Sequence, residues 1–264
     1  MLDRLRDWIA TIADLTRFLS RLPLPSSDRS PRPLATTLGY APLAGLLIAL
    51  GPALLLAGAT LAGLPSLVAT TLAVAAMILA TGGLHEDGLA DTADGFGGGS
   101  TRERKLEIMR DSRIGAFGAL ALACGLLLRV GCLQSLTERA GPAGAALALV
   151  AAAVLSRALM LVPMALLAPV RADGLARTAG TPNGRTVLTA LCLGLPIASV
   201  LALGTRMAGF QVIVGLLLSI VVALGMTRLA RDQLGGVTGD VVGATQQVTE
   251  AAFLIALCAG VPLL

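Results

Sequence analysis

The chain contains a series of long apolar runs that carry almost no charge, and these runs limit the folds open to it. Each approaches the ~20 residues that an α-helix needs to cross the hydrocarbon core of a bilayer. Only 14% of the residues are charged, whereas soluble domains carry about 25%. The composition argues against a water-soluble fold, and the runs predict seven spans at roughly 40–62, 65–83, 114–133, 143–168, 187–204, 209–227 and 248–264.

The basic residues between the spans indicate how the chain is oriented. Sixteen of the 20 lysines and arginines lie in segments that share one side if seven spans alternate, namely 1–39, 84–113, 169–186 and 228–247. The other side has only Arg139 and Arg206, while Arg129 and Arg157 fall within spans. Because short cytoplasmic loops retain positive charge, we expect a cytoplasmic N-terminus and an outward C-terminus.

Residues 1–33 form a distinct N-terminal part. Apolar positions recur at helical spacing over residues 1–22, with charges between them, which is typical of a helix lying in the membrane interface with Trp8 at headgroup level. An amphipathic helix packed on the protein itself explains the pattern equally well. Four prolines between residues 23 and 33 then predict a turn. The chain is thus expected to be one all-α integral membrane domain, 1–264, comprising a helix bundle and this N-terminal helix.

The segment 82–113 holds the densest group of acidic residues. It begins with GGLHEDGLADTADGFGGG, which places Glu86, Asp87, Asp91 and Asp94 within nine residues. On a helix, Asp87, Asp91 and Asp94 fall at i, i+4 and i+7 and share one narrow face. Carboxylates so close repel one another unless a cation neutralises them, and oxygen donors suit hard ions such as Mg²⁺. The pattern predicts a metal site made by these aspartates, with Glu86 as a fourth candidate ligand.

The sequence gives weaker indications of a role for two neighbours of the aspartates, His85 and Gly88. His85, the only histidine, points away from the aspartates on an ideal helix, so we expect it to hydrogen-bond near the substrate rather than to bind metal. Gly88 is expected to leave room for a substrate phosphate. The simpler explanation of the whole segment is a solvated acidic loop, against which the one-sided spacing of the aspartates argues.

Basic residues follow the acidic run closely. Five of them follow before residue 114, namely Arg102, Arg104, Lys105, Arg110 and Arg113. We take Arg110, Asp111 and Arg113 as candidates for substrate binding. Guanidinium groups make bidentate contacts with phosphate oxygens while a metal bridges others, which is the usual arrangement for phosphoryl transfer. Anchoring to lipid headgroups would explain about half of these basic residues.

Two more candidates lie further along the chain. Arg157 is an ionisable residue near the centre of a span, so it needs an anionic partner, either a carboxylate such as Glu250 or a substrate diphosphate. Asp240 ends GGVTGD, which repeats the shape of GGLHED at 82–87, although chance explains the repeat about as well in a chain with 31 glycines. We count Asp240 as a candidate for the metal shell or for a substrate ribose.

The runs GGLHEDGLADTADGFGGG and LEIMRDSRIGAFGAL resemble the cobalamin synthase family, the adenosylcobinamide-GDP ribazoletransferases. The resemblance extends to FLSRLPLP, YAPLAGLLIAL, the Ser156-Arg157 pair and LGGVTGDVVGA, so it covers most of the chain. Glu86 departs from it, at a position where many members have an apolar residue.

The resemblance implies a Mg²⁺-dependent phosphotransferase of the bacterial inner membrane, with its active site on the cytoplasmic side. A hydroxyl of α-ribazole, or of its 5′-phosphate, would attack the cobinamide-side phosphorus of adenosylcobinamide-GDP and expel GMP. Asp91 or Asp94 would take the hydroxyl proton. The partners implied are these two substrates and the lipid bilayer; a homo-oligomer stays open, and no nucleic acid is expected because no basic face with interleaved aromatic residues exists.

Two other functions compete with this one. A divalent-cation transporter would also combine several helices with carboxylates, but transporters place ion ligands near the bilayer midplane, whereas these carboxylates follow the end of a span. A CDP-alcohol phosphotransferase shares two aspartates three apart followed by glycine, matched by Asp91, Asp94 and Gly95. The rest of that signature is missing, so this likeness is chemical analogy only.

Overall fold

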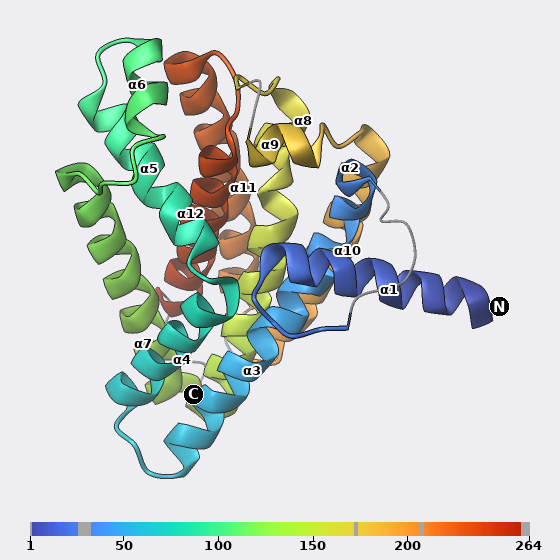
Figure 1. The fold of residues 1–264 in the computed structure, drawn as a ribbon. Helices are drawn as coiled ribbons and strands as arrows, with labels where there is room; N and C mark the ends of the chain where they lie inside the picture. The colour runs from blue at the N-terminus through green and yellow to red at the C-terminus, as the bar shows by residue number, and fades with distance from the viewer. Residues whose placement is uncertain (1, 26–32, 172–173, 206–208, 260–264) are drawn as a thin grey trace.

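The structure is a computed structural model that describes residues 2–25, 33–171, 174–205 and 209–259. These ranges contain helices and, apart from one isolated bridge between Pro169 and Val237, no strand pairing, which confirms the all-α prediction (Figure 1). The helices are α1 (Leu2–Leu19), α2 (Leu34–Thr37), α3 (Ala41–Leu61), α4 (Ser66–Thr81), α5 (Leu84–Gly98), α6 (Arg102–Ile108), α7 (Ala116–Leu159), α8 (Leu161–Leu166), α9 (Leu175–Ala179), α10 (Gly184–Leu203), α11 (Gly209–Leu234) and α12 (Gly239–Cys258).

Several helices are long and apolar enough to cross a membrane. In the described ranges they are Leu34–Leu61, Ala116–Leu166, Gly184–Leu203, Gly209–Leu234 and Gly239–Cys258, and α4 with α5 adds a sixth crossing if the bent pair is one span. The stretch from Ala116 is interrupted at Gly141, which adopts φ 75° and ψ 175°. Figure 1 shows its two halves running in opposite directions. Counted separately, these halves bring the total to about seven, in agreement with the sequence.

The last span differs most from its prediction. It was expected to start at residue 248, but α12 begins at Gly239. Asp240, Gln246 and Gln247 lower the hydropathy of this first part, and the structure shows the two glutamines buried between helices instead of facing lipid. Residues 260–264, which the predicted span includes, lie outside the described residues.

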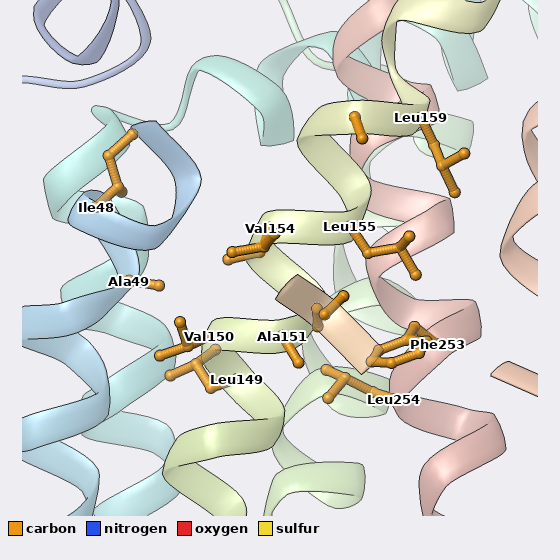
Figure 2. Packing of buried hydrophobic residues seen from close by; sticks show 14 of the residues in the cluster. Ile48, Ala49, Leu149, Val150, Ala151, Val154, Leu155, Leu159, Phe253 and Leu254 are labelled. Atoms are coloured by element: carbon orange, nitrogen blue, oxygen red, sulfur yellow. The ribbon is translucent and has the colours of Figure 1, made fainter. Parts of the chain in front are cut away.

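The spans pack through large apolar side chains, with small residues where two helices come closest, as expected where lipid removes the hydrophobic drive between helices. On α7, Val154 points toward Ile48 and Ala49 of α3, while Leu155 points toward Phe253 of α12 (Figure 2). Gly45 shows how close α3 and α7 are, because a Cβ atom there would lie 2.6 Å from the carbonyl oxygen of Ala153. Glycine at this position therefore sets the distance between the two helices.

The connecting segments gather at two ends of the bundle. At one, called here the site end, the segments after α8 and α11 form the Pro169–Val237 bridge, and Arg171 donates a hydrogen bond to the carbonyl oxygen of Leu106 in α6. At the opposite end, Ser66 donates to Glu138, and Arg139 donates to the carbonyl oxygen of Cys258. The loops thus alternate between ends, as the charge pattern requires.

Helix α1 has features of both positions expected for it, packed on the protein and exposed at its surface. Leu15 and Leu19 are buried against the bundle, while Trp8 is 55% exposed and meets Tyr40 with ring centroids 5.5 Å apart. One face therefore packs on the protein and another remains open to the surroundings. The proline-rich turn expected up to residue 33 lies partly in 26–32, outside the described residues.

We expect Gly45→Ala to destabilise the bundle and Gly51→Ala not to. A methyl group at Gly45 must displace the α7 backbone, and overpacking of this kind costs about 1–3 kcal/mol. Gly51 lies on the same helix, and a Cβ atom there would meet no neighbouring atom within 4 Å, so alanine gains helix propensity only. Thermal unfolding in detergent measures the difference, and equal melting temperatures would contradict the close packing of α3 and α7.

Candidate active site

The acidic helix α5 begins at a sharp break in the chain. Gly82 and Gly83 adopt φ values of 67° and 74°, a region that glycine enters without a steric cost, and α5 leaves α4 at an angle of 89°. Helix α5 then packs on α12, where a Cβ atom on Gly88 would lie 2.7 Å from the carbonyl oxygen of Asp240. Glycine at this position therefore makes room for α12, and its expected role toward a substrate phosphate stays a prediction.

Asp87 and Asp91 lie together on an open groove at the site end. This groove, called here the open groove, has a volume of about 660 Å³ and is lined by both aspartates, Arg21, Ser112 and Gly82 among others. The negative charges of Asp87 and Asp240 both act on Asp91, and the positive charge of Arg171 opposes them. The predicted crowding of carboxylates is thus present, with Asp240 as a further member.

Asp94 has a different environment from the other two aspartates. Its side chain is 7% exposed, and its oxygens accept hydrogen bonds from the backbone N–H groups of Gly115, at 2.7 Å, and Gly118, at 2.8 Å. These N–H groups belong to the start of α7, where a carboxylate is favoured by the unpaired donors and the helix dipole. Asp94 therefore ties α5 to α7.

The three aspartates do not form a closed metal site by themselves. In the part of the chain that the structure describes, no three His, Cys, Asp or Glu side chains are grouped closely enough to hold an ion. Asp87 and Asp91 remain available to the groove, whereas Asp94 is engaged with α7.

Glu86 points into the protein, away from the groove. Its carboxylate accepts hydrogen bonds from Arg129, at 2.9 Å, and from Gln247, at 3.1 Å. Arg129 also lies 3.8 Å from Glu250. This places Glu86 in a buried ion-pair network between α5, α7 and α12, so the structure gives no support to its expected role as a metal ligand.

Arg157 belongs to the same network. It is 1% exposed, donates to the carbonyl oxygen of Ala153, and lies 3.8 Å from Glu250, which also accepts a hydrogen bond from Gln246 at 2.7 Å. Of the two partners considered for Arg157, the structure supplies the protein carboxylate. A direct contact between this buried arginine and a substrate is therefore not supported.

His85 is also buried, but it borders an empty space. Its exposed fraction is 3%, and its Nδ1 atom has no hydrogen-bond partner among the described residues. It lines a second space, called here the inner cavity, together with Asp87, Asp240 and apolar side chains such as Met160 and Met164. The sequence-based expectation of a hydrogen-bonding group near the substrate is compatible with this position.

The predicted basic residues lie on the exposed link between α6 and α7. Arg113 and Asp111 form an ion pair at 2.6 Å, and this hydrogen bonding lowers the pKa of Asp111 to about 2. Both line a pocket that also borders Asp94, while Arg110 is exposed nearby. The candidates thus lie beside the acidic helix, although the charges of Asp111 and Arg113 are directed at each other.

Two arginines at the site were not predicted. Arg21, at the end of α1, lies over Gly82 and lines the open groove. Arg171, after α8, forms an ion pair with Asp240 at 3.0 Å. Arg21 falls within the FLSRLPLP run, which resembles the family and could have marked this arginine as a candidate. The sequence does not show, however, that the packing of distant segments brings either arginine to the aspartates.

The fold and this site define a class, that of polytopic membrane proteins with a carboxylate pair and arginines on a groove at one end of the bundle. Residues 11–258 match the cobalamin-5-phosphate synthase family, and the chain belongs to it. Proteins named adenosylcobinamide-GDP ribazoletransferase are similar over nearly the full length. That of Azorhizobium caulinodans is 47% identical, covering 94% of both chains, and that of Mesorhizobium japonicum is 46% identical, covering 90% of this chain and 88% of the relative.

A third relative, from Bradyrhizobium diazoefficiens, has the same name and is 43% identical, covering 97% of this chain and 96% of its own. No solved structure matches the chain. The resemblance noted from the sequence motifs is therefore confirmed at the level of the family.

We expect Glu86→Ala to lower the stability of the folded protein strongly. Removing one partner of a buried ion pair leaves a charge without compensation and typically costs about 3–5 kcal/mol. Glu107→Ala is the matched control, because its ion pair with Arg104 is exposed and such pairs contribute at most about 1 kcal/mol. The melting temperatures of the two variants in detergent, monitored by size-exclusion chromatography after heating, measure the two effects. A Glu86→Ala protein as stable as Glu107→Ala would show that the network does not hold the bundle together.

Proposed function

We propose that this transferase joins adenosylcobinamide-GDP to α-ribazole, or to its 5′-phosphate, with release of GMP. Family membership over residues 11–258 gives the reaction class, and the observation that supports its location is the Asp87–Asp91 pair on the open groove. The groove, at about 660 Å³, is larger than the pocket that borders Asp111 and Arg113, at about 380 Å³.

The proposed reaction is a single displacement at phosphorus. The ribazole hydroxyl oxygen forms a bond to the cobinamide-side phosphorus, the bond from that phosphorus to the bridging oxygen breaks, and GMP leaves with the electron pair. The hydroxyl proton passes to a carboxylate acting as general base. We assign this role to Asp91, because it faces the groove while both oxygens of Asp94 are already bonded to α7.

We further propose that Asp87 and Asp91 hold Mg²⁺ when substrate is bound. Their oxygen donors and mutual repulsion suit a hard cation, and Mg²⁺ is commonly held by one or two carboxylates with substrate phosphates completing its shell. Bound there, the ion would neutralise charge that develops on the diphosphate. Asp94 is given a positioning role, and Glu86 is left out of the metal set because Arg129 and Gln247 occupy it.

Arginines beside the groove supply the remaining positive charge. Arg21 lines the same groove as the aspartates, and Arg104 and Arg113 line the pocket on the other side of Asp94. Guanidinium groups bind phosphate oxygens through paired hydrogen bonds. We propose Arg21 as a diphosphate-binding residue, in place of the buried Arg157.

A cation-transport function is less well supported by the interior of the bundle. The buried carboxylates Glu86 and Glu250 each lie within 4 Å of an arginine, at 2.9 Å from Arg129 and 3.8 Å from Arg157 respectively. A path for divalent cations would need intramembrane carboxylates that are free to bind them.

The activity test uses purified full-length protein in detergent with adenosylcobinamide-GDP, α-ribazole phosphate and Mg²⁺. We expect GMP release that depends on all three components, because neither the nucleophile nor the ion can be omitted. Release that proceeds without the ribazole compound would indicate a hydrolase, and absence of release under every condition would contradict the proposal.

Asp91→Asn should nearly abolish GMP release while leaving the protein folded. The amide neither takes the proton nor contributes charge to the ion, and one such electrostatic group is typically worth ~10²–10³ in rate. Asp94→Asn should instead lower the melting temperature as well as the rate, because an amide has one acceptor oxygen for two N–H donors. Rates and melting curves of both variants separate the two roles. Normal turnover by Asp91→Asn would remove it from the site.

We also propose that the protein lies in the bacterial inner membrane with the site end in the cytoplasm. The 16-to-2 distribution of basic residues supports this orientation, and the alternation of loops between two ends is compatible with it. Reporter fusions test it: a fusion within 99–115 should show cytoplasmic activity, and one after Leu264 should show activity on the outer side. The reverse result would require the opposite orientation.

A further inference from the structure

Two cysteines from distant parts of the chain meet toward the end of the bundle opposite the site. Cys132 lies in the first half of α7, and Cys258, 126 positions further along, is the last residue of α12. Both are free thiols in the structure, and their Sγ atoms are 3.4 Å apart. This separation exceeds the ~2.05 Å of a disulfide bond by only about 1.4 Å. A small side-chain movement would therefore bring the two sulfurs to bonding distance.

The two helices are fixed against each other on both sides of this thiol pair. Arg129, one turn before Cys132 on α7, lies 3.8 Å from Glu250 of α12. Beyond the pair, Arg139 of α7 donates a hydrogen bond to the carbonyl oxygen of Cys258 at 2.7 Å. The contact between the sulfurs is thus a product of the packing of α7 on α12 and persists as long as that packing does.

The two thiols differ in how open they are to a reagent. Cys132 is 7% exposed, whereas Cys258 is half-buried and is followed by the exposed Ala259. In the orientation proposed above, this end of the bundle faces away from the cytoplasm. Disulfides form and persist on that side of the bacterial inner membrane, because thiol-oxidising proteins keep it oxidising.

We propose that Cys132 and Cys258 form a disulfide bond in the cell, made by a disulfide-bearing thiol oxidant on the outer side of the membrane. This inference rests on the proposed orientation. The thiolate of Cys258 attacks one sulfur of the oxidant's disulfide, forming a mixed disulfide and expelling the first oxidant thiolate. The thiolate of Cys132 then attacks the sulfur of Cys258 and expels the second. Two electrons pass to the oxidant, and its two thiolates take up the two protons that the cysteines lose.

Two other roles for the pair have less support. A soft metal ion would need further ligands, and within the described ranges no three His, Cys, Asp or Glu side chains are grouped closely enough to hold one. Simple packing is the other role, since Cys258 can donate to the carbonyl oxygen of Ile255 at 3.3 Å and a buried cysteine acts as a small apolar residue. Packing accounts for each thiol singly, but two thiols in contact do not stay reduced where oxidants act on them.

The bond would act on stability rather than on turnover. It would close a loop of 126 residues and so restrict the unfolded chain, which is the main way in which a disulfide stabilises a fold. It would also join the end of α12 to α7, whose first residues hold Asp94. The groove lies at the other end of the bundle, so we expect GMP release to be the same with and without the bond.

The test counts free thiols in full-length protein taken from cells. The background variant is Cys124→Ser with Cys192→Ser, because both of these cysteines are exposed and neither belongs to the pair. The protein is denatured in maleimide-polyethylene glycol with and without prior dithiothreitol. We expect no label before reduction and two labels after it. Cys132→Ser in the same background is the matched control, and its Cys258 should take one label without reduction.

Thermal unfolding in detergent supplies a second measurement. Dithiothreitol should lower the melting temperature of the background variant by several degrees and leave that of the Cys132→Ser control unchanged. Two labels without reduction would overturn the disulfide. The reporter fusion after Leu264 then separates the two proposals: outer-side activity rejects the disulfide alone, and cytoplasmic activity rejects the orientation with it.

Discussion

The buried ion-pair network of Glu86, Arg129, Glu250 and Arg157 is the interaction on which the rest of the structure depends. A charge inside a membrane bundle is tolerated only when it is paired, so α5, α12 and both halves of α7 must meet where these side chains lie. Glu86 directly precedes Asp87 on α5. Since successive helical residues point in different directions, the inward position of Glu86 turns Asp87 and Asp91 toward the open groove.

The acidic residues of α5 consequently divide into separate roles despite their closeness in sequence. Glu86 fixes the rotation of the helix, Asp94 joins it to the start of α7, and Asp87 and Asp91 are left to line the open groove. The contacts of Glu86 and Asp94 stabilise a helix position in which the carboxylates of Asp87 and Asp91 lie close enough to repel each other. Such local conflict is common at functional sites, where the surrounding structure compensates for it.

Much of the fold could be predicted from the sequence, because membrane spans and loop charges obey strong physical limits. The start of α12 could not, since hydropathy does not distinguish Gln246 and Gln247 facing another helix from glutamines facing lipid. Helical spacing predicted one shared face for Asp87, Asp91 and Asp94, and the structure brings only Asp87 and Asp91 together on the open groove. The spacing carried no information on Asp94, whose partners Gly115 and Gly118 lie over 20 residues away. Arg21 and Arg171 were missed for the same reason: their positions follow from tertiary packing alone.

The break at Gly82 and Gly83 has a consequence for the surrounding lipid. Helix α4 has 16 residues and so extends about 24 Å, less than the ~30 Å thickness of a hydrocarbon core. A helix shorter than the core is accommodated by local thinning of the bilayer, by snorkelling of flanking residues or by oligomerisation. Local thinning would bring the aqueous phase down to Asp87, so that a large polar corrinoid need not enter the membrane to reach its reaction partner.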